Sequence, residues 1–166
     1  NFLELQEEIE EEREEEKEEN DNVIRSEEEY FLEWHNVNQF IEEIITNKWK
    51  ETWELKWETI STSLLIFQEQ PTLLGPYLEG IIVPLTNCLI EILQQYQQEI
   101  FTKFQRMENM QFHVICKVLQ LFCRIRGYKH VIKYFPHEVW HIELCMSALR
   151  AQDKTDHNNW ETRYIM

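Results

Sequence analysis

The chain has 166 residues, 43% hydrophobic and 28% charged, and a formal net charge of −15 at pH 7. Three glycines and four prolines are too few for the frequent turns of an all-β fold, so the composition predicts an all-helical protein. Residues 1–33 carry −13 of the charge, which leaves residues 34–166 close to neutral. This balance argues against nucleic acid or an anionic membrane surface as the main partner.

The first 25 residues form a low-complexity segment with Glu at most positions between Glu7 and Glu19. This composition is typical of a disordered or frayed helical segment, because it offers little apolar surface to bury. Ser26, followed by Glu29, has the pattern of a capping box and predicts that a helix begins there. We therefore expect an acidic segment over residues 1–25 and a helical domain over residues 26–166.

Two amphipathic helices are predicted next. Apolar residues recur at spacings of three and four, first from Tyr30 to Ile44 and then from Trp49 to Phe67. The second stripe contains three tryptophans one turn apart, at positions 49, 53 and 57. Large aromatic residues at this spacing are more typical of a core than of an exposed adhesive face, which is the alternative.

Pro71 is predicted to end the second helix, and Gly75 and Pro76 to start a third. A fourth helix near residues 111–126 has apolar residues on two faces, one with Phe112, Ile115, Cys116, Leu119, Phe122 and Cys123, the other with Val114, Val118, Leu121 and Ile125. A helix that is apolar on two faces must be covered on both, as the inner helices of stacked helix pairs are. The pattern indicates a line of packed helices.

The clearest helix boundaries come after this fourth helix. Gly127 is predicted to follow its last turn with positive φ. Pro136 suits the first position of a new helix, which would place His137 and Glu138 in its first turn. A last helix is predicted to begin at Asn158 as its cap, with Trp160 and Tyr164 opening a buried stripe.

Residues 137–141 read His-Glu-Val-Trp-His, the HExxH pattern of zinc peptidases. On a helix this spacing puts two imidazoles on one face, with Glu138 placed to act as a base on a zinc-bound water. The pattern is weak here because Pro136 puts His137 at the start of the helix and no third-ligand motif follows. We expect no enzyme activity, no metal and no cofactor, and keep a zinc metallopeptidase as the least favoured alternative.

The four cysteines, Cys88, Cys116, Cys123 and Cys145, lie in apolar helical runs without a CxxC pair. This predicts reduced structural thiols in a cytosolic protein, with a metal site of Cys116 and Cys123 beside His113 and His130 as the alternative. The longest apolar run, near Ile81–Leu85, is too short to span a membrane.

Three blocks resemble the N-terminal region of the tubulin-folding cofactor D family. They read RGYK at residues 126–129, FPHEV at 135–139 and WETRY at 160–164. An earlier block, QEQPTLLGPYLE at residues 68–79, is similar to the family's segment one helix pair upstream. The resemblance implies an α-solenoid of armadillo-like or HEAT-like helix pairs, expected here to be truncated after Met166.

The resemblance also implies a function. The family is a chaperone family that binds β-tubulin after the chaperonin and takes part in assembling the αβ-tubulin heterodimer. It works with other tubulin-folding cofactors and an Arl-type small GTPase, and contributes to activating the GTPase of tubulin. A cytoplasmic, cytoskeleton-associated location is therefore expected. A helical scaffold for another protein partner is the alternative.

The matching blocks contain packing residues and partner-binding candidates. The residues expected to pack in the core are Tyr128, Phe135, Val139, Trp160 and Tyr164. The candidates for a surface that meets a protein partner are Lys129, His137 and Arg163. The acidic segment is expected to be a solubilising tail, with an intramolecular competitor that imitates an acidic tubulin tail as the alternative.

Overall fold

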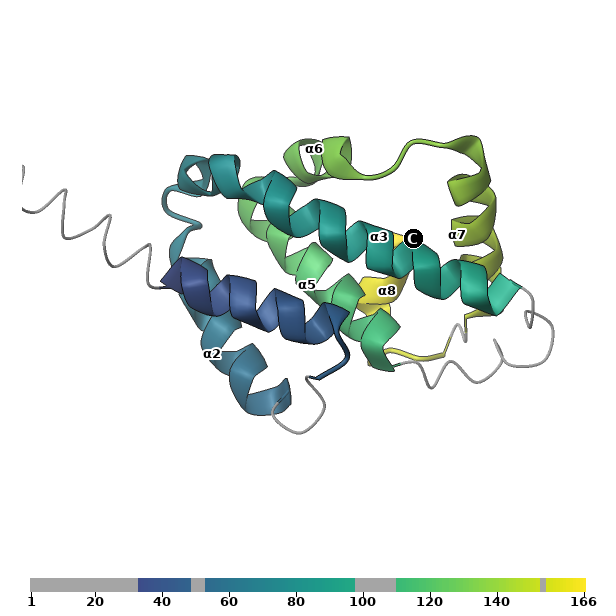
Figure 1. The fold of residues 1–166 in the computed structure, drawn as a ribbon, viewed down its shortest axis with the longest axis horizontal. Coiled ribbons are helices and arrows are strands. Elements are labelled where there is room, and N and C mark those ends of the chain that lie inside the picture. Colours follow the sequence, from purple (N-terminus) through teal and green to yellow (C-terminus); the bar gives the residue numbers. More distant parts are fainter. Residues whose placement is uncertain (1–32, 49–52, 98–109, 153–154) are drawn as a thin grey trace, which may run out of the picture. The chain divides into compact units, whose positions relative to one another are not determined.

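The structure is a computed structural model that describes residues 33–48, 53–97, 110–152 and 155–166 (Figure 1). The chain divides into two compact units, Asn1–Val37 and Asn38–Met166, and most of the described residues belong to the second. No residue that the structure describes lies in a strand, so the all-helical prediction is confirmed. The acidic segment, the Ser26 cap and Trp49 lie outside the described residues.

Residues 33–45 form a helix, and α2 spans Trp53–Ile66. Aromatic rings join the two: Trp53 stacks on Phe40 with 5.7 Å between ring centroids, and on Trp57 with 5.1 Å. Trp53 is 8% exposed. The prediction that the tryptophan stripe belongs to the core is thus confirmed for Trp53, while Trp57 is half-buried.

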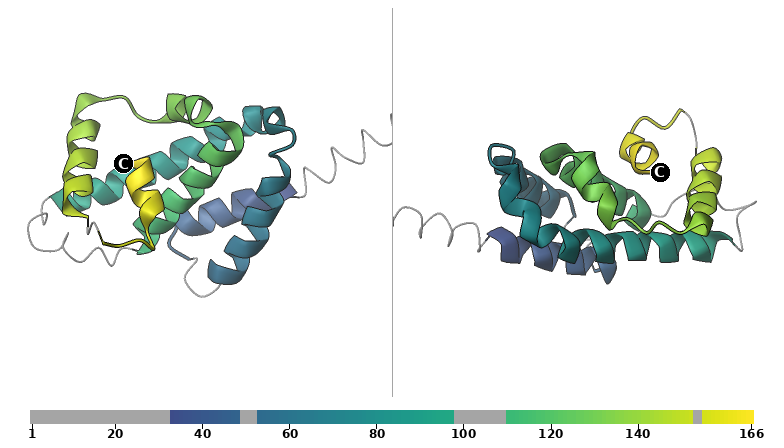
Figure 2. Two further views of the ribbon diagram at one scale, coloured as in Figure 1. Left: turned by 180° about the vertical axis from the view of Figure 1, so that it is seen from behind. Right: turned by 90° about the horizontal axis from the view of Figure 1, so that it is seen from above.

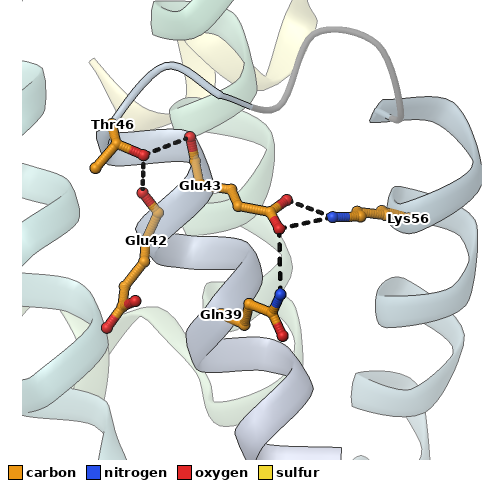
Figure 3. A network of polar contacts seen from close by, with 5 residues as sticks. All are labelled: Gln39, Glu42, Glu43, Thr46 and Lys56. Atoms are coloured by element: carbon orange, nitrogen blue, oxygen red, sulfur yellow. Dashed lines mark hydrogen bonds and ion pairs between the residues drawn. The ribbon is translucent and has the colours of Figure 1, made fainter.

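A polar network also joins these two helices (Figure 3). Nζ of Lys56 donates to the two carboxylate oxygens of Glu43 at 2.7 and 2.5 Å, and Nε2 of Gln39 donates to the same carboxylate at 3.5 Å. The side chains of Lys56 and Glu43 are 37% and 19% exposed. A pair with this much solvent access contributes about 1 kcal/mol or less, so packing rather than charge holds the helices together.

The chain then passes through the 3-10 turn η1, Pro71–Tyr77, into α3, Leu78–Gln97. The buried residues of α3 include Leu78, Ile81, Ile82, Leu85, Leu89 and Leu93. The stretch Pro71–Gln95 is long and apolar enough to cross a membrane by length and composition alone, a test that core helices also pass. Because α3 packs against both α5 and α7, we interpret it as a core helix.

Helix α5, Met110–Arg126, contacts η1, α2, α3, α6 and α8 (Figures 1 and 2). All the residues predicted for its two apolar faces are buried, so the two-faced prediction is confirmed. Gly127 has a φ of 90°, the positive value expected after the last turn, and its N–H donates to the Cys123 carbonyl at 2.9 Å. An L side chain rarely adopts this backbone conformation, so glycine suits the position.

Four short elements complete the chain: α6 at Tyr128–Val131, η3 at Ile132–Tyr134, α7 at Val139–Ala151 and α8 at Trp160–Ile165. Helix α7 packs on α3, and its buried residues are Leu144 and Ala148. Helix α8 lies alongside α5 (Figure 2). The predicted order of helices is therefore correct, although several predicted boundaries are not. Helix α2 ends at Ile66 and not at Pro71, and α3 begins at Leu78 and not at Gly75 or Pro76.

The start of α7 differs from the prediction. The helix begins at Val139, with Glu138 as an extended N-cap residue at φ −76° and ψ 140°, so His137 lies outside the helix. Phe135 is also extended, as a residue before a proline tends to be. The Glu138 carboxylate accepts a hydrogen bond from the indole Nε1 of Trp140, and no side-chain cap forms. Pro136 therefore belongs to an extended connection.

The start of α8 differs as well. Its N-cap residue is Asn159, without a side-chain cap, and not Asn158. The carboxylate of Asp156 accepts hydrogen bonds from the Asn159 side-chain amide at 2.8 Å and from the Asn158 main-chain N–H at 3.0 Å. These bonds hold the pKa of Asp156 below its ordinary value, and the bond from the Asn159 side chain has the largest effect. The Asn159 side-chain amide is therefore engaged with Asp156 and does not cap α8.

Candidate functional site

The three predicted partner-binding residues lie on different elements. Lys129 is on α6, His137 in the connection before α7, and Arg163 on α8. The side chains of Lys129 and His137 are exposed, whereas Arg163 is half-buried. Lys129 and His137 are thus accessible to a partner, and the grouping of all three into one surface stays a prediction.

The residues expected to pack in the core are largely exposed, so that prediction is wrong for this fold. Trp160 and Tyr164 are 47% and 53% exposed and contact each other edge to face, with 6.4 Å between ring centroids. Tyr128 and Val139 are exposed too, and Phe135 is half-buried. On α8 the side chain that is buried is Thr162. Thr162 is two residues from both Trp160 and Tyr164 in the sequence, so its side chain lies on the opposite face of the helix from theirs.

An exposed apolar face runs along α7. Val139, Ile142 and Met146 recur at spacings of three and four, and their side chains are 75%, 60% and 42% exposed. Trp140, next to them, is 41% exposed. Contiguous apolar side chains at the surface are typical of protein contact sites. Sequence reasoning missed this face, although its helical spacing can be read from residues 139–146.

A buried polar contact holds α8 on α5. Oγ1 of Thr162 lies 2.7 Å from Nδ1 of His113, and Thr162 is 1% exposed. The same hydroxyl hydrogen-bonds the thiol of Cys116. Burial raises the pKa of Cys116 far above its ordinary value, although the bond to Thr162 opposes the shift. The cluster has the buried, satisfied character of a structural contact and offers no nucleophile.

All four cysteines are free thiols, three of them buried. Burial raises the pKa of Cys123 to about 11 and shifts the pKa values of Cys88 and Cys145 in the same direction. A thiol with such a pKa stays protonated at neutral pH and neither attacks substrates nor binds metals readily. In the part of the chain that the structure describes, no group of three or more His, Cys, Asp or Glu side chains is arranged to hold a metal ion.

The HExxH segment does not have the geometry that a zinc peptidase needs. His137 precedes α7, so the two imidazoles are not one helical turn apart on one face. Glu138 accepts the hydrogen bond from Trp140, and the Trp140 ring lies against the His141 ring with 3.8 Å between centroids. The segment therefore lacks the helical frame on which the metallopeptidase alternative depends.

A basic surface lies where α5 ends. Residues 109–137 contain five Lys or Arg and no Asp or Glu, a local excess hidden by the near-neutral charge of residues 34–166. We define the basic corner as Arg124, Tyr128, Lys129, Ile132 and Lys133, all of which are exposed. A charge sum over a window of about thirty residues would have found it from the sequence.

The chain is similar to a family of known proteins. The family model described as tubulin-specific chaperone D-like, ARM repeat matches residues 64–166, which is well over half of the chain. The matched range begins inside α2 and ends at Met166, directly after α8. No solved structure matches the chain.

Proposed function

The chain belongs to the tubulin-specific chaperone D-like ARM repeat family, and on this basis we propose that it binds β-tubulin during assembly of the αβ-tubulin heterodimer. Because the chain belongs to this family, its all-helical fold is armadillo-like and its role is related to that of a tubulin chaperone. The family match over residues 64–166 is the observation that carries the proposal.

The physical features of the fold support a holding function. Helix α5 is covered by different neighbours on its two sides, as in stacked repeats, which present extended surfaces to large folded partners. The apolar face of α7 and the aromatic pair on α8 remain exposed for such contact. We propose that the chain performs no chemistry itself. It contributes to activation of tubulin's GTPase, in the cytoplasm and at the cytoskeleton, together with other tubulin-folding cofactors and an Arl-type small GTPase.

Binding of newly folded tubulin chains tests the proposal directly. Radiolabelled β-tubulin, α-tubulin and actin, each released from chaperonin, are incubated with the purified 166-residue chain and resolved on native gels. We expect a retained complex with β-tubulin only. Equal retention of all three would indicate a non-specific adhesive surface, and absence of a β-tubulin complex would favour a scaffold for another partner.

A pair of matched double variants tests the predicted contact residues in the same assay. Lys129→Glu with His137→Ala changes two exposed candidates, and Lys48→Glu with His35→Ala makes the same changes at exposed positions elsewhere. We expect β-tubulin binding to weaken about tenfold in the first variant only. Arg163 is left intact because it takes part in an interaction within the fold. Equal effects of the two variants would remove these residues from the contact surface.

The contribution to GTP hydrolysis needs a separate measurement. Phosphate release from GTP is followed with tubulin, with the chain, and with both together in the presence of the partner cofactors. We expect stimulation only when tubulin, the chain and the cofactors are all present. Hydrolysis by the chain alone would contradict the proposed non-enzymatic role.

A further inference from the structure

The basic corner carries more cations than the end of α5 uses. Arg124 lies in the last turn of α5, where the negative end of the helix dipole stabilises a cation. Lys129 and Lys133 lie beyond Gly127, in α6 and η3, and so do not serve that helix. Main-chain N–H groups already satisfy the carbonyls at this turn: Gly127 donates to Cys123 at 2.9 Å and His130 to Gly127 at 3.1 Å.

These cations also lack counter-charges in the structure. Among the described residues, none of the corner's three cations takes part in an ion pair. Glu138, which follows η3 after a short connection, is engaged with Trp140. Nζ of Lys133 lies 5.1 Å from the ring centroid of Tyr134. This ring carries no negative charge, so the charge of Lys133 stays uncompensated. The positive charge is therefore available to a ligand.

Two apolar side chains accompany the lysines. Tyr128 and Ile132 are 56% and 51% exposed, and they are four residues apart, as Lys129 and Lys133 are. This spacing puts each pair on one side of the helical turn that α6 and η3 form together. A ligand that fits must therefore supply both negative charge and apolar contact.

We propose that the basic corner binds an acidic, glutamate-rich peptide in which apolar residues are interspersed. Carboxylates pair with Arg124, Lys129 and Lys133, and apolar side chains cover Tyr128 and Ile132. A peptide fits better than nucleic acid, because three cations can neutralise only a few phosphates and nucleic-acid affinity grows with the number of phosphates neutralised.

The test measures peptide binding to the whole 166-residue chain by fluorescence anisotropy. The probe is a labelled synthetic peptide with the sequence of residues 4–19, which combines glutamates with Leu5 and Ile9. A control peptide has glutamine in place of every glutamate. We expect binding of the first peptide only, and weaker binding as salt rises from about 50 to about 300 mM because salt screens exposed charges.

Two charge-reversal variants locate the site. Lys129→Glu with Lys133→Glu alters the corner, and Lys48→Glu with Arg150→Glu makes an equal change in net charge at exposed positions outside it. We expect about tenfold weaker binding for the corner variant, and a change within about twofold for the control. A third variant, Tyr128→Ser with Ile132→Ser, should also weaken binding. Far-ultraviolet circular dichroism checks that all of them fold.

Four outcomes would overturn the proposal. The chain would fail to bind the glutamate peptide, or bind the glutamine control equally well. The two charge-reversal variants would lose affinity equally, which would indicate net charge alone. A short DNA duplex would bind the corner more tightly than the peptide does, which would identify a nucleic-acid surface instead.

Discussion

The side-chain amide Nε2 of Gln111 donates a hydrogen bond of 2.8 Å to the main-chain oxygen of Ile44. It also lies 3.3 Å from the main-chain oxygen of Ile45. The last carbonyls of a helix have no partner within that helix, so a residue at the start of α5 satisfies the end of the 33–45 helix. The contact joins segments 67 residues apart in the chain.

Replacing Gln111 with alanine should lower the free energy of unfolding by about 1 kcal/mol, because the Ile44 carbonyl keeps only the Asn47 N–H as a donor and the Ile45 carbonyl loses its contact with Gln111. Urea denaturation followed by circular dichroism measures the change. Gln94→Ala, at an exposed position of α3, is the matched control and should change stability by less than about 0.5 kcal/mol. Equal effects at both positions would show that the Gln111 contact contributes nothing.

The Thr162 hydroxyl should stabilise the docking of α8. Thr162→Val keeps the shape of the side chain but removes the hydroxyl that contacts His113 and Cys116, and should cost about 1 to 3 kcal/mol. Urea denaturation measures the cost, and limited proteolysis should then cut the chain before α8 more quickly. The control is Thr62→Val, at an exposed position where the hydroxyl bonds only its own helix. Unchanged stability in Thr162→Val would contradict the prediction.

Stability should fall at alkaline pH through Cys123. Below its ordinary pKa of 9.0 the thiol is protonated in both states, and between 9.0 and about 11 it ionises only in the unfolded state. Because the unfolded state alone gains from losing this proton, the free energy of unfolding decreases as pH rises through that range.

Urea midpoints between about pH 8 and pH 11 measure the effect, and Cys123→Ala should show a shallower decrease than the unchanged chain. Val118→Ala removes a buried side chain that cannot ionise, so it should lower every midpoint without altering the pH dependence. A Cys123→Ala curve parallel to that of the unchanged chain would contradict the role of this thiol.

The HExxH segment should bind no zinc tightly. Since His137 lies outside α7, treatment with EDTA should leave the thermal unfolding midpoint unchanged, and purified protein should contain less than about 0.1 zinc per chain. Elemental analysis and calorimetry check this. Stoichiometric zinc, or peptide hydrolysis that disappears in Glu138→Gln, would restore the metallopeptidase alternative.

Much of the helical layout could be predicted because burial leaves a periodic trace in the sequence. The apolar residues of α5 recur on two faces, and both faces are covered. Gly127 could be placed because an apolar helical run ends in two cations just before it, and its positive φ results from that position. In both cases local chemistry and tertiary packing favour the same answer.

The rest could not be predicted because spacing tells which residues share a face, but not which face meets a neighbour. Trp160 and Tyr164 do share a face of α8, yet the face that is buried carries Thr162. Pro136 suits a helix start and an extended connection equally well. The structure has the extended connection, and in it Glu138 accepts a hydrogen bond from Trp140. The charge sum over residues 34–166 averaged away the basic corner.

The many neighbours of α5 have a consequence for the order in which the molecule opens. Main-chain amides of α5 can exchange with deuterium only when several adjoining elements separate together, so their exchange should report global unfolding. Helix α7, which buries only Leu144 and Ala148, can detach in a smaller fluctuation. Its amides should exchange before those of α5, so the apolar face that α7 exposes belongs to a segment that can adjust its position when a partner arrives.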